Sequence, residues 1–313
     1  MFSIIIPLYN KALYLEKAVR SVLNQSFRDF ELIVVNDGST DNSLEVAKGL
    51  QADTADFQIV DQNNAGVSTA RNNGVKHAKY PYICFLDADD WWEPTFLEEM
   101  KGLIRAFPEA GIYGSSYYIV KHQQKRIAPI GVEDGFKRGL IDYCRVYAKT
   151  LCMPLTSISV VIPTSVFEQE HGFKPALKLG EDFDLWLRIA MKYPVAFLNK
   201  PLAYYNQDVE LVNRAIGEKL YEPHQHMLFS DYGALMQQLD FRFLYERLAL
   251  YGLLPYYISG KNKTEVKSII SAVDWKQHAT KYRIYYKILP RWIVKIWFRF
   301  KKFGSVIKKK LIV

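Results

Sequence analysis

The first 90 residues alternate between short apolar runs and segments in which apolar side chains recur every three or four positions. Four runs are almost wholly apolar, as is typical of strands buried on both faces of a parallel sheet: Phe2–Pro7, Leu32–Val35, Phe57–Val60 and Tyr82–Leu86. Three segments between them have the periodicity of amphipathic helices: Ala12–Leu23, Ser43–Leu50 and Val67–Ala78. The pattern predicts an α/β domain whose parallel sheet is covered by helices.

Beyond residue 90 the pattern is less regular. A helix is expected over Thr95–Phe107, with Pro94 at its first turn, and a second one over Asp182–Lys192. From about Asn213 onward the pattern is mainly helical. No internal repeat or low-complexity linker marks a sharp domain boundary.

Membrane insertion and secretion are not expected. The strand-like run begins at Phe2, with no basic segment before it. The longest uncharged stretch, Thr150–Phe167, contains Pro154, Pro163 and six Ser or Thr residues, which argues against a transmembrane helix. The three cysteines have no metal-ligand spacing and suit a reducing compartment: Cys84, Cys144 and Cys152. We therefore expect a cytoplasmic protein.

The formal net charge of +8 lies at one end of the chain. Residues 275–313 contain twelve basic residues and no acid, since Asp274 is the last one. Residues 1–274 consequently carry −4. A mildly acidic body argues against a nucleic-acid partner for residues 1–274.

The basic end has an amphipathic pattern after Pro290. Its apolar residues recur at three- and four-residue steps: Trp292, Ile293, Ile296, Trp297, Phe300, Phe303 and Ile307. Its basic residues fall on the opposite side: Arg291, Lys295, Arg299 and Lys302. The pattern predicts a helix that lies on an anionic membrane surface. Packing of the aromatic face on the body or a partner subunit is the main alternative, and nucleic-acid binding through the same charges is a weaker one.

Polar residues follow each of the first four predicted strands. They occupy positions 7–10, 36–41, 63–66 and 87–90. Ligands of open parallel sheets bind outside the carboxyl ends of the strands, so these segments are the candidate site. Neither the glycine-rich dinucleotide fingerprint nor the P-loop pattern is present. Carboxylates at such a site favour a divalent cation, Mg²⁺ or Mn²⁺, that bridges them to a diphosphate.

Five segments in order carry a resemblance to a known family. They are PLYN (7–10), VVNDGSTDN (34–42), NAGVSTARNNG (64–74), FLDADD (85–90) and GEDFDLWLRIA (180–190). The chain resembles the inverting glycosyltransferases of family 2, of the bacterial surface-polysaccharide type. The resemblance implies the GT-A fold, a Rossmann-like, mostly parallel central sheet flanked by helices, here with a helical C-terminal extension. It also implies a nucleotide-sugar-binding half over 1–105, an acceptor-binding half over 106–212, and the C-terminal region over 213–313.

The donor nucleotide is expected beside the first two strand ends. Tyr9 is able to stack on a base, and Asp37 to accept a hydrogen bond from a ring N–H. The resemblance assigns this region to uracil or another base, with Pro7 and Asn10 beside it. Arg71 has the planar fork suited to a ribose or phosphate oxygen. The alternatives are a turn-forming or helix-capping role for Asp37 and a solvated helix position for Arg71.

The reacting centre is expected at two acidic segments. The resemblance places Asp87 near the ribose and makes Asp89 the metal ligand. It assigns the base that deprotonates the acceptor hydroxyl to Asp182, which the dipole of the helix it opens tends to keep ionised. Glu181 and Trp186 are expected on the acceptor side. Alternatively, the two acids only stabilise the helix start, and Trp186 belongs to the core.

One segment departs from the family pattern. Many members have a histidine at the metal or diphosphate site in a downstream segment, which here is Tyr205–Asp208. Asp208 is the expected substitute metal ligand, or else a simple loop acid.

The sequence therefore predicts a metal-dependent, inverting glycosyltransferase. Its donor is a nucleotide sugar, expected to be UDP-linked, and its acceptor a saccharide or lipid-linked saccharide of surface-polysaccharide synthesis. We expect it at the inner face of the cytoplasmic membrane, attached peripherally through the tail. A nucleotidyltransferase on a similar sheet and a noncatalytic membrane scaffold are the alternatives.

Overall fold

The computed structural model describes residues 1–51, 56–209 and 219–298. The chain divides into two compact units, Met1–Gly217 and Glu218–Val313. Among the described residues, no helix has the length and apolar character needed to cross a membrane. Five named positions of the expected amphipathic helix lie outside the described residues: Arg299, Phe300, Lys302, Phe303 and Ile307.

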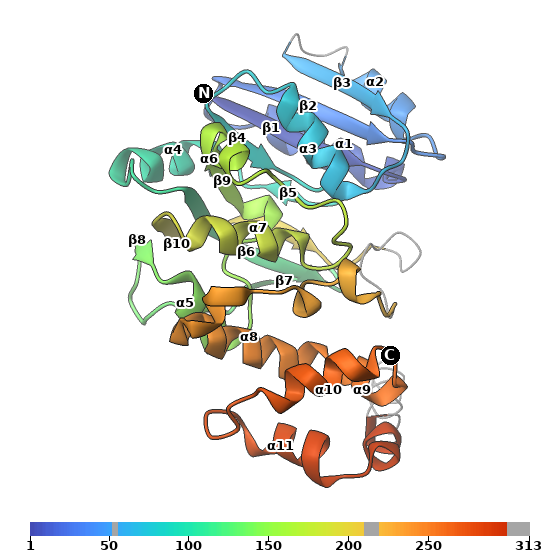
Figure 1. The fold of residues 1–313 in the computed structure, drawn as a ribbon. Helices are drawn as coiled ribbons and strands as arrows, with labels where there is room; N and C mark the ends of the chain where they lie inside the picture. The colour runs from blue at the N-terminus through green and yellow to red at the C-terminus, as the bar shows by residue number, and fades with distance from the viewer. Residues whose placement is uncertain (52–55, 210–218, 299–313) are drawn as a thin grey trace. The chain divides into compact units, whose positions relative to one another are not determined.

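The first unit is built on one sheet, and its first four strands are parallel in the order β3–β2–β1–β4. They are β1 (Phe2–Leu8), β2 (Phe30–Asp37), β3 (Phe57–Gln62) and β4 (Tyr82–Phe85). Figure 1 shows β1, β2 and β3 side by side, with α3 lying across them. The carboxyl ends of these strands meet at one edge, as the sequence pattern predicted.

Helices cover both faces of these strands. They are α1 (Ala12–Leu23), α2 (Ser43–Gln51) and α3 (Val67–Lys76). Ile4 belongs to one core cluster with Leu15 of α1. Its neighbour Ile5 faces α3, where a side chain at Gly74 would come within 2.5 Å of Ile5. Because alternate side chains of β1 are buried under different helices, the strand is apolar throughout.

The second half of the sheet is mixed. It continues β4–β9–β6–β10–β5, with β7 paired to β6 and β8 to β10. The elements are β5 (Trp91–Trp92), α4 (Phe96–Ala106), β6 (Ile112–Lys121), β7 (Gln124–Ile127), β8 (Arg138–Ile141), α5 (Tyr143–Thr150), β9 (Val160–Pro163), α6 (Thr164–Gln169), α7 (Glu181–Ala190) and β10 (Val195–Asn206). β9 is antiparallel to both β4 and β6, whereas β6 and β10 are parallel. The α/β class is thus confirmed, and the mostly parallel arrangement holds only as far as β4.

The second unit is helical. Its α-helices are α8 (Leu239–Gly252), α9 (Leu254–Ser259), α10 (Lys263–Ser271) and α11 (Thr280–Arg283), and residues 291–298 are also helical. A buried carboxylate joins α8 to the chain before α11: Glu246 pairs with Arg242 at 2.9 Å and with His278 at 2.7 Å, and it accepts a hydrogen bond from the Asp274 amide. A helical C-terminal region is therefore present, as expected.

Candidate active site

The loops that follow β1 and β2 are tied together by polar side chains. Asn10, at a φ of +50°, accepts a hydrogen bond from the Thr40 amide through Oδ1 (2.7 Å). The Lys11 amide donates to Ser43 Oγ at the start of α2 (2.8 Å). Tyr9, between these contacts and β1, is 46% exposed. The PLYN segment thus forms one rim of the site, and base stacking by Tyr9 stays a prediction.

Pro7 lies inside β1 rather than in the loop. It is buried and pairs in register with Val35 of β2. The pairing of β1 with β4 ends at Ile5. Pro7 has no amide hydrogen, but it lies past the end of this pairing, so no hydrogen bond between the two strands is lost. A nucleotide contact by Pro7 would therefore involve its backbone and not its ring.

Asp37 organises the turn before α3. Its Oδ1 accepts hydrogen bonds from the side chain of Gln62 (2.7 Å) and from the Ala65 amide (2.8 Å). Its Oδ2 accepts one from the Gly66 amide (2.9 Å). These contacts support the turn-forming alternative, and the hydrogen bond to a base stays a prediction.

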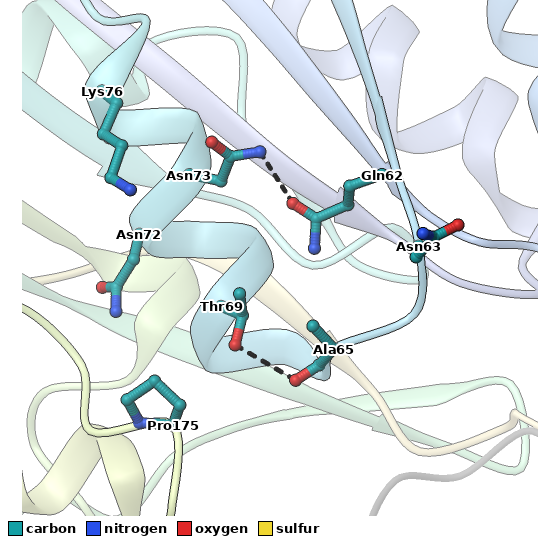
Figure 2. A pocket seen from close by; sticks show the side chains of 8 residues that line it. All are labelled: Gln62, Asn63, Ala65, Thr69, Asn72, Asn73, Lys76 and Pro175. Carbon is teal, nitrogen blue, oxygen red and sulfur yellow. Dashed lines mark hydrogen bonds between the residues drawn. The ribbon is translucent and has the colours of Figure 1, made fainter.

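A polar pocket of about 380 Å³ lies next to this turn (Figure 2). Gln62 connects it to Asp37, and Asn73 donates a hydrogen bond to Gln62 Oε1 (2.7 Å). Five of its eight lining residues carry a side-chain amide or hydroxyl group; the lining is Gln62, Asn63, Ala65, Thr69, Asn72, Asn73, Lys76 and Pro175. The pocket contains none of the acidic residues predicted for the reaction.

Arg71 is the centre of the site. It projects from α3 and is buried, with its guanidinium over the ring of Phe173. Nη2 donates to Asp87 Oδ1 at 2.7 Å, and Nη1 lies 3.4 Å from Glu181 Oε1. One cation therefore joins three segments that are far apart in the sequence: NAGVSTARNNG, FLDADD and GEDFDLWLRIA. The alternative of a solvated helix arginine is excluded.

Asp182 lies beside this ion pair at the start of α7. The helix is entered through Gly180, whose φ of +81° suits glycine. Burial of the Asp182 carboxyl group and the charge of Glu181 raise its pKa to about 7, against the opposing effect of Arg71. The expectation that the helix dipole keeps this group ionised is corrected, because burial and a neighbouring carboxylate outweigh the dipole.

The other acidic residues of FLDADD lie close together. Asp89 pairs with Lys11 at 2.6 Å, and burial and the charge of Asp87 raise the pKa of Asp89. Asp90 is buried and accepts a hydrogen bond from the Asn206 amide (2.7 Å), which anchors the end of β10. Burial and both neighbouring aspartates hold the pKa of Asp90 well above its usual value. The site therefore contains more carboxyl groups than cations, and burial together with this crowding raises the pKa values of Asp89 and Asp90.

This surplus of carboxylates fits a divalent cation. Oxygen ligands are those that Mg²⁺ and Mn²⁺ prefer, and Mg²⁺ commonly uses one or two carboxylates together with substrate phosphates. The described residues contain no group of three potential ligands that could hold a metal without substrate. Asp89 lies close to Asp87 and is paired with Lys11, and its role as metal ligand stays a prediction.

Asp208, the second predicted ligand, has a structural function in the described conformation. Its two carboxylate oxygens accept hydrogen bonds from the amides of His122 (2.6 Å) and Gln123 (2.8 Å). Both residues have positive φ in the turn between β6 and β7. Asp208 therefore stabilises a strained hairpin turn, and its role as metal ligand stays a prediction.

Trp186 does not face an acceptor. It is fully buried in α7, and its ring packs edge-on against Phe173, with centroids 5.8 Å apart. A sugar cannot stack on a ring enclosed by the core, so the acceptor-floor prediction is corrected. Trp186 shares a helix with Asp182, but Trp186 is fully buried, whereas Asp182 at the start of α7 is only partly buried.

Two residues of the site were missed in the sequence. Lys11 follows PLYN directly, and its position at a strand end was the available signal. Asp184 is buried in α7 and pairs with Lys174 (2.7 Å) and with Arg188 (2.9 Å). Since Arg188 also donates to the Gly172 carbonyl (2.7 Å), this network fixes the loop that carries Phe173 under Arg71. The four-residue spacing of Asp184 and Arg188 was its only sequence signal.

Comparisons with known proteins indicate the family of the chain. A family model described as glycosyl transferase family 2 matches residues 3–150. The glycosyltransferase GlyA of Streptococcus pneumoniae is 37% identical over 223 residues, which are 69% of this chain and 32% of that protein. The hyaluronan synthase of Pasteurella multocida is 44% identical over 98 residues, 31% of this chain and 10% of the synthase. The chain spans about a third or less of the length of the curated relatives it matches.

Solved structures share the fold at low sequence identity. The S. aureus protein TarS (residues 1–349), crystallised with UDP-GlcNAc, is 17% identical, with a TM-score of 0.69 over 88% of this chain and 82% of that one. The mannosyltransferase PcManGT of Pyrobaculum calidifontis, in complex with GDP-Man and Mn²⁺, is 14% identical, with a TM-score of 0.56 over 94% and 85%. At these identities the likeness concerns the fold alone. Taken together with the five segments and the acidic centre that Arg71 joins, these matches identify the chain as a family 2 glycosyltransferase with the GT-A fold.

Proposed function

We propose that this chain transfers a sugar from a UDP-linked donor to a hydroxyl group of a saccharide, with inversion at the anomeric carbon. The observation that carries the proposal is the pair of contacts from buried Arg71 to Asp87 and Glu181. They place a candidate donor segment and a candidate base segment in one centre. TarS, crystallised with UDP and with UDP-GlcNAc, supports the choice of nucleotide.

The donor would bind along the carboxyl edge of the strands. Tyr9 is exposed enough to stack on the base, and Asp37 lies at the adjacent strand end. Asn10 holds the loop between them through Thr40. Arg71 and Asp87 lie further along the same edge, where the ribose and diphosphate are expected.

Asp182 would take the proton from the acceptor hydroxyl. The acceptor oxygen then bonds to the anomeric carbon from the side opposite the diphosphate. The bond between that carbon and the diphosphate oxygen breaks, and its electron pair leaves with UDP. A pKa of about 7 leaves Asp182 partly ionised at neutral pH and strong enough as a base to share the proton in the transition state.

Asp89 would hold the divalent cation, with Asp208 as the second predicted ligand. A bound cation would offset the negative charge that develops on the leaving diphosphate. Lys11 pairs with Asp89 in the described conformation and compensates part of the same charge. Glu181, partly exposed beside Asp182, is the remaining residue proposed on the acceptor side.

The acceptor is proposed to be a saccharide or a lipid-linked saccharide. Chondroitin synthase and hyaluronan synthase are among the relatives by sequence, which supports a role in surface-polysaccharide synthesis. In this proposal residues 1–105 bind the donor and 106–212 the acceptor. The same proposal places the enzyme at the inner face of the cytoplasmic membrane, attached through its C-terminal region.

Thermal unfolding with nucleoside diphosphates, each with and without Mn²⁺, tests the donor site. UDP with Mn²⁺ should raise the Tm most, and Asp89→Ala should abolish the contribution of Mn²⁺. Products identify the reaction: a glycosyltransferase releases UDP from a UDP-sugar, whereas a nucleotidyltransferase releases pyrophosphate. No stabilisation by any nucleoside diphosphate would refute the proposal and favour a scaffold.

A further inference from the structure

Large apolar side chains are exposed near the end of the described chain. Ile288 is 65% exposed, Trp292 64%, Ile296 44% and Trp297 58%. These four residues are called the 288–297 patch below. Exposed tryptophan is costly in water unless the surface has a partner, so a concentration of such residues indicates a docking surface.

In the helical segment 291–298, Trp292 and Ile296 point away from the segment's own packing contacts. Val294 is fully buried, whereas Trp292 and Ile296, two positions before and after it, point to the opposite side of the helix. Arg291 donates a hydrogen bond to the Ile258 carbonyl (3.2 Å) and its guanidinium lies against Gly260. The segment is therefore attached to the α9 region through Arg291 and Val294. Trp292 and Ile296 are exposed within the second unit, and packing on the body or on a partner subunit stays the alternative.

The sequence around the patch carries only positive charge. Between residues 275 and 298 there are six basic residues and no acidic one: Lys276, Lys281, Arg283, Lys287, Arg291 and Lys295. Lys287 precedes Ile288, Lys295 precedes Ile296, and both lysines are exposed. A second copy of this surface would bring like charges together, which disfavours self-association through it.

We propose that the 288–297 patch docks on an anionic lipid surface, with its tryptophan and isoleucine side chains in the interface and its lysines at the lipid phosphates. Tryptophan is favoured at the boundary between headgroups and acyl chains, and lysine beside it is attracted to anionic lipid. The segment would lie on the bilayer and not span it. This deepens the membrane part of the proposed function by naming the surface that makes contact.

Flotation of the full-length protein with lipid vesicles tests the patch. We expect binding to phosphatidylcholine vesicles that contain phosphatidylglycerol, and little binding to phosphatidylcholine alone. Trp292→Ser with Ile296→Ser should weaken binding by more than about tenfold. Lys287→Gln with Lys295→Gln should weaken it by about fivefold per lysine, and less at high salt. Leu239→Ser, a change at a residue 78% exposed in the same unit, is the matched control and should bind as the parent does.

Three outcomes would overturn the proposal. The first is parent-like binding by the Trp292 and Ile296 variant, which would assign attachment to another segment. The second is equal binding to both kinds of vesicle. The third is a dimer in sedimentation that the same variant converts to a monomer, which would make a second copy the occupant. Circular dichroism establishes that each variant is folded, and the UDP-induced Tm shift, measured without lipid, reports the donor site separately.

Discussion

Replacement of Asp182 by Asn tests the proposed base most directly. The amide keeps the size of the side chain and removes its ability to accept the proton. General-base catalysis contributes about 10²- to 10⁴-fold, so kcat should fall by at least about a hundredfold. Donor binding should persist, because Arg71 still pairs with Asp87 and Glu181.

The pH dependence gives the magnitude that the structure predicts. With the pKa of Asp182 at about 7 in the unliganded protein, about a tenth of the molecules hold the ionised base at pH 6 and about nine tenths at pH 8. The kcat/KM of the parent should therefore rise about tenfold between these values. The Asn variant should lack this rise. Because the charge of Glu181 is one cause of the raised pKa, Glu181→Gln should move the rise to lower pH.

The assay is UDP release at saturating cation across the pH range, with Glu45→Gln as control. Glu45 is an exposed carboxylate in the first turn of α2, so its replacement repeats the chemical change at another helix start. This control should leave the profile unchanged. Near-parental turnover by Asp182→Asn, or an Asn variant that keeps the same rise with pH, would refute the assignment of the base.

Three further changes follow from the same charges. The pKa of Asp182 in the folded protein exceeds its ordinary value of 3.8, so ionisation of Asp182 lowers the stability of the fold as pH rises from about 4 to above 7. In urea unfolding, Asp182→Asn should be more stable than the parent by up to about 4 kcal/mol at pH 8. The two proteins should not differ in this way at about pH 3. Arg71→Met leaves the carboxylates of Asp87 and Glu181 without their cation and should lower the free energy of unfolding by about 3 kcal/mol at pH 8 in urea unfolding. An unchanged free energy would show that these two ion pairs contribute nothing to stability. Lys11→Met removes the cation beside Asp89 and should tighten Mn²⁺ binding about tenfold in calorimetry with UDP present, whereas weaker binding would contradict competition at that carboxylate.

The first four strands and their helices were predictable because burial on both faces of the sheet produces a recognisable apolar pattern within each segment. The predicted Ala12–Leu23 helix has the same bounds in the structure, with Leu15, Ala18, Val19 and Val22 buried as expected. The strand pattern over Phe2–Pro7 ends one residue before β1 does. In both cases the apolar positions depend only on the period of the element itself.

The strands of the second half of the sheet have no such recognisable apolar pattern. β9 is four residues long and pairs antiparallel with β4 and β6. Both of these strands lie tens of residues before it in the sequence. β10 changes register beside Pro201, so its alternation is broken where it pairs with β6. A short strand or a strand with an irregular register has no period that can be recognised without its neighbours.

By itself, the sequence determined the element order of the first ninety residues, the family, and the residue types that gather at the strand ends. Only the tertiary structure decided what those residues touch. Arg71 could have been solvated, and Trp186 could have faced a sugar, because a helix position does not reveal what packs against it. The same holds for Asp182: its helix dipole is a local property, but its pKa follows from burial and from charges that the fold brings beside it.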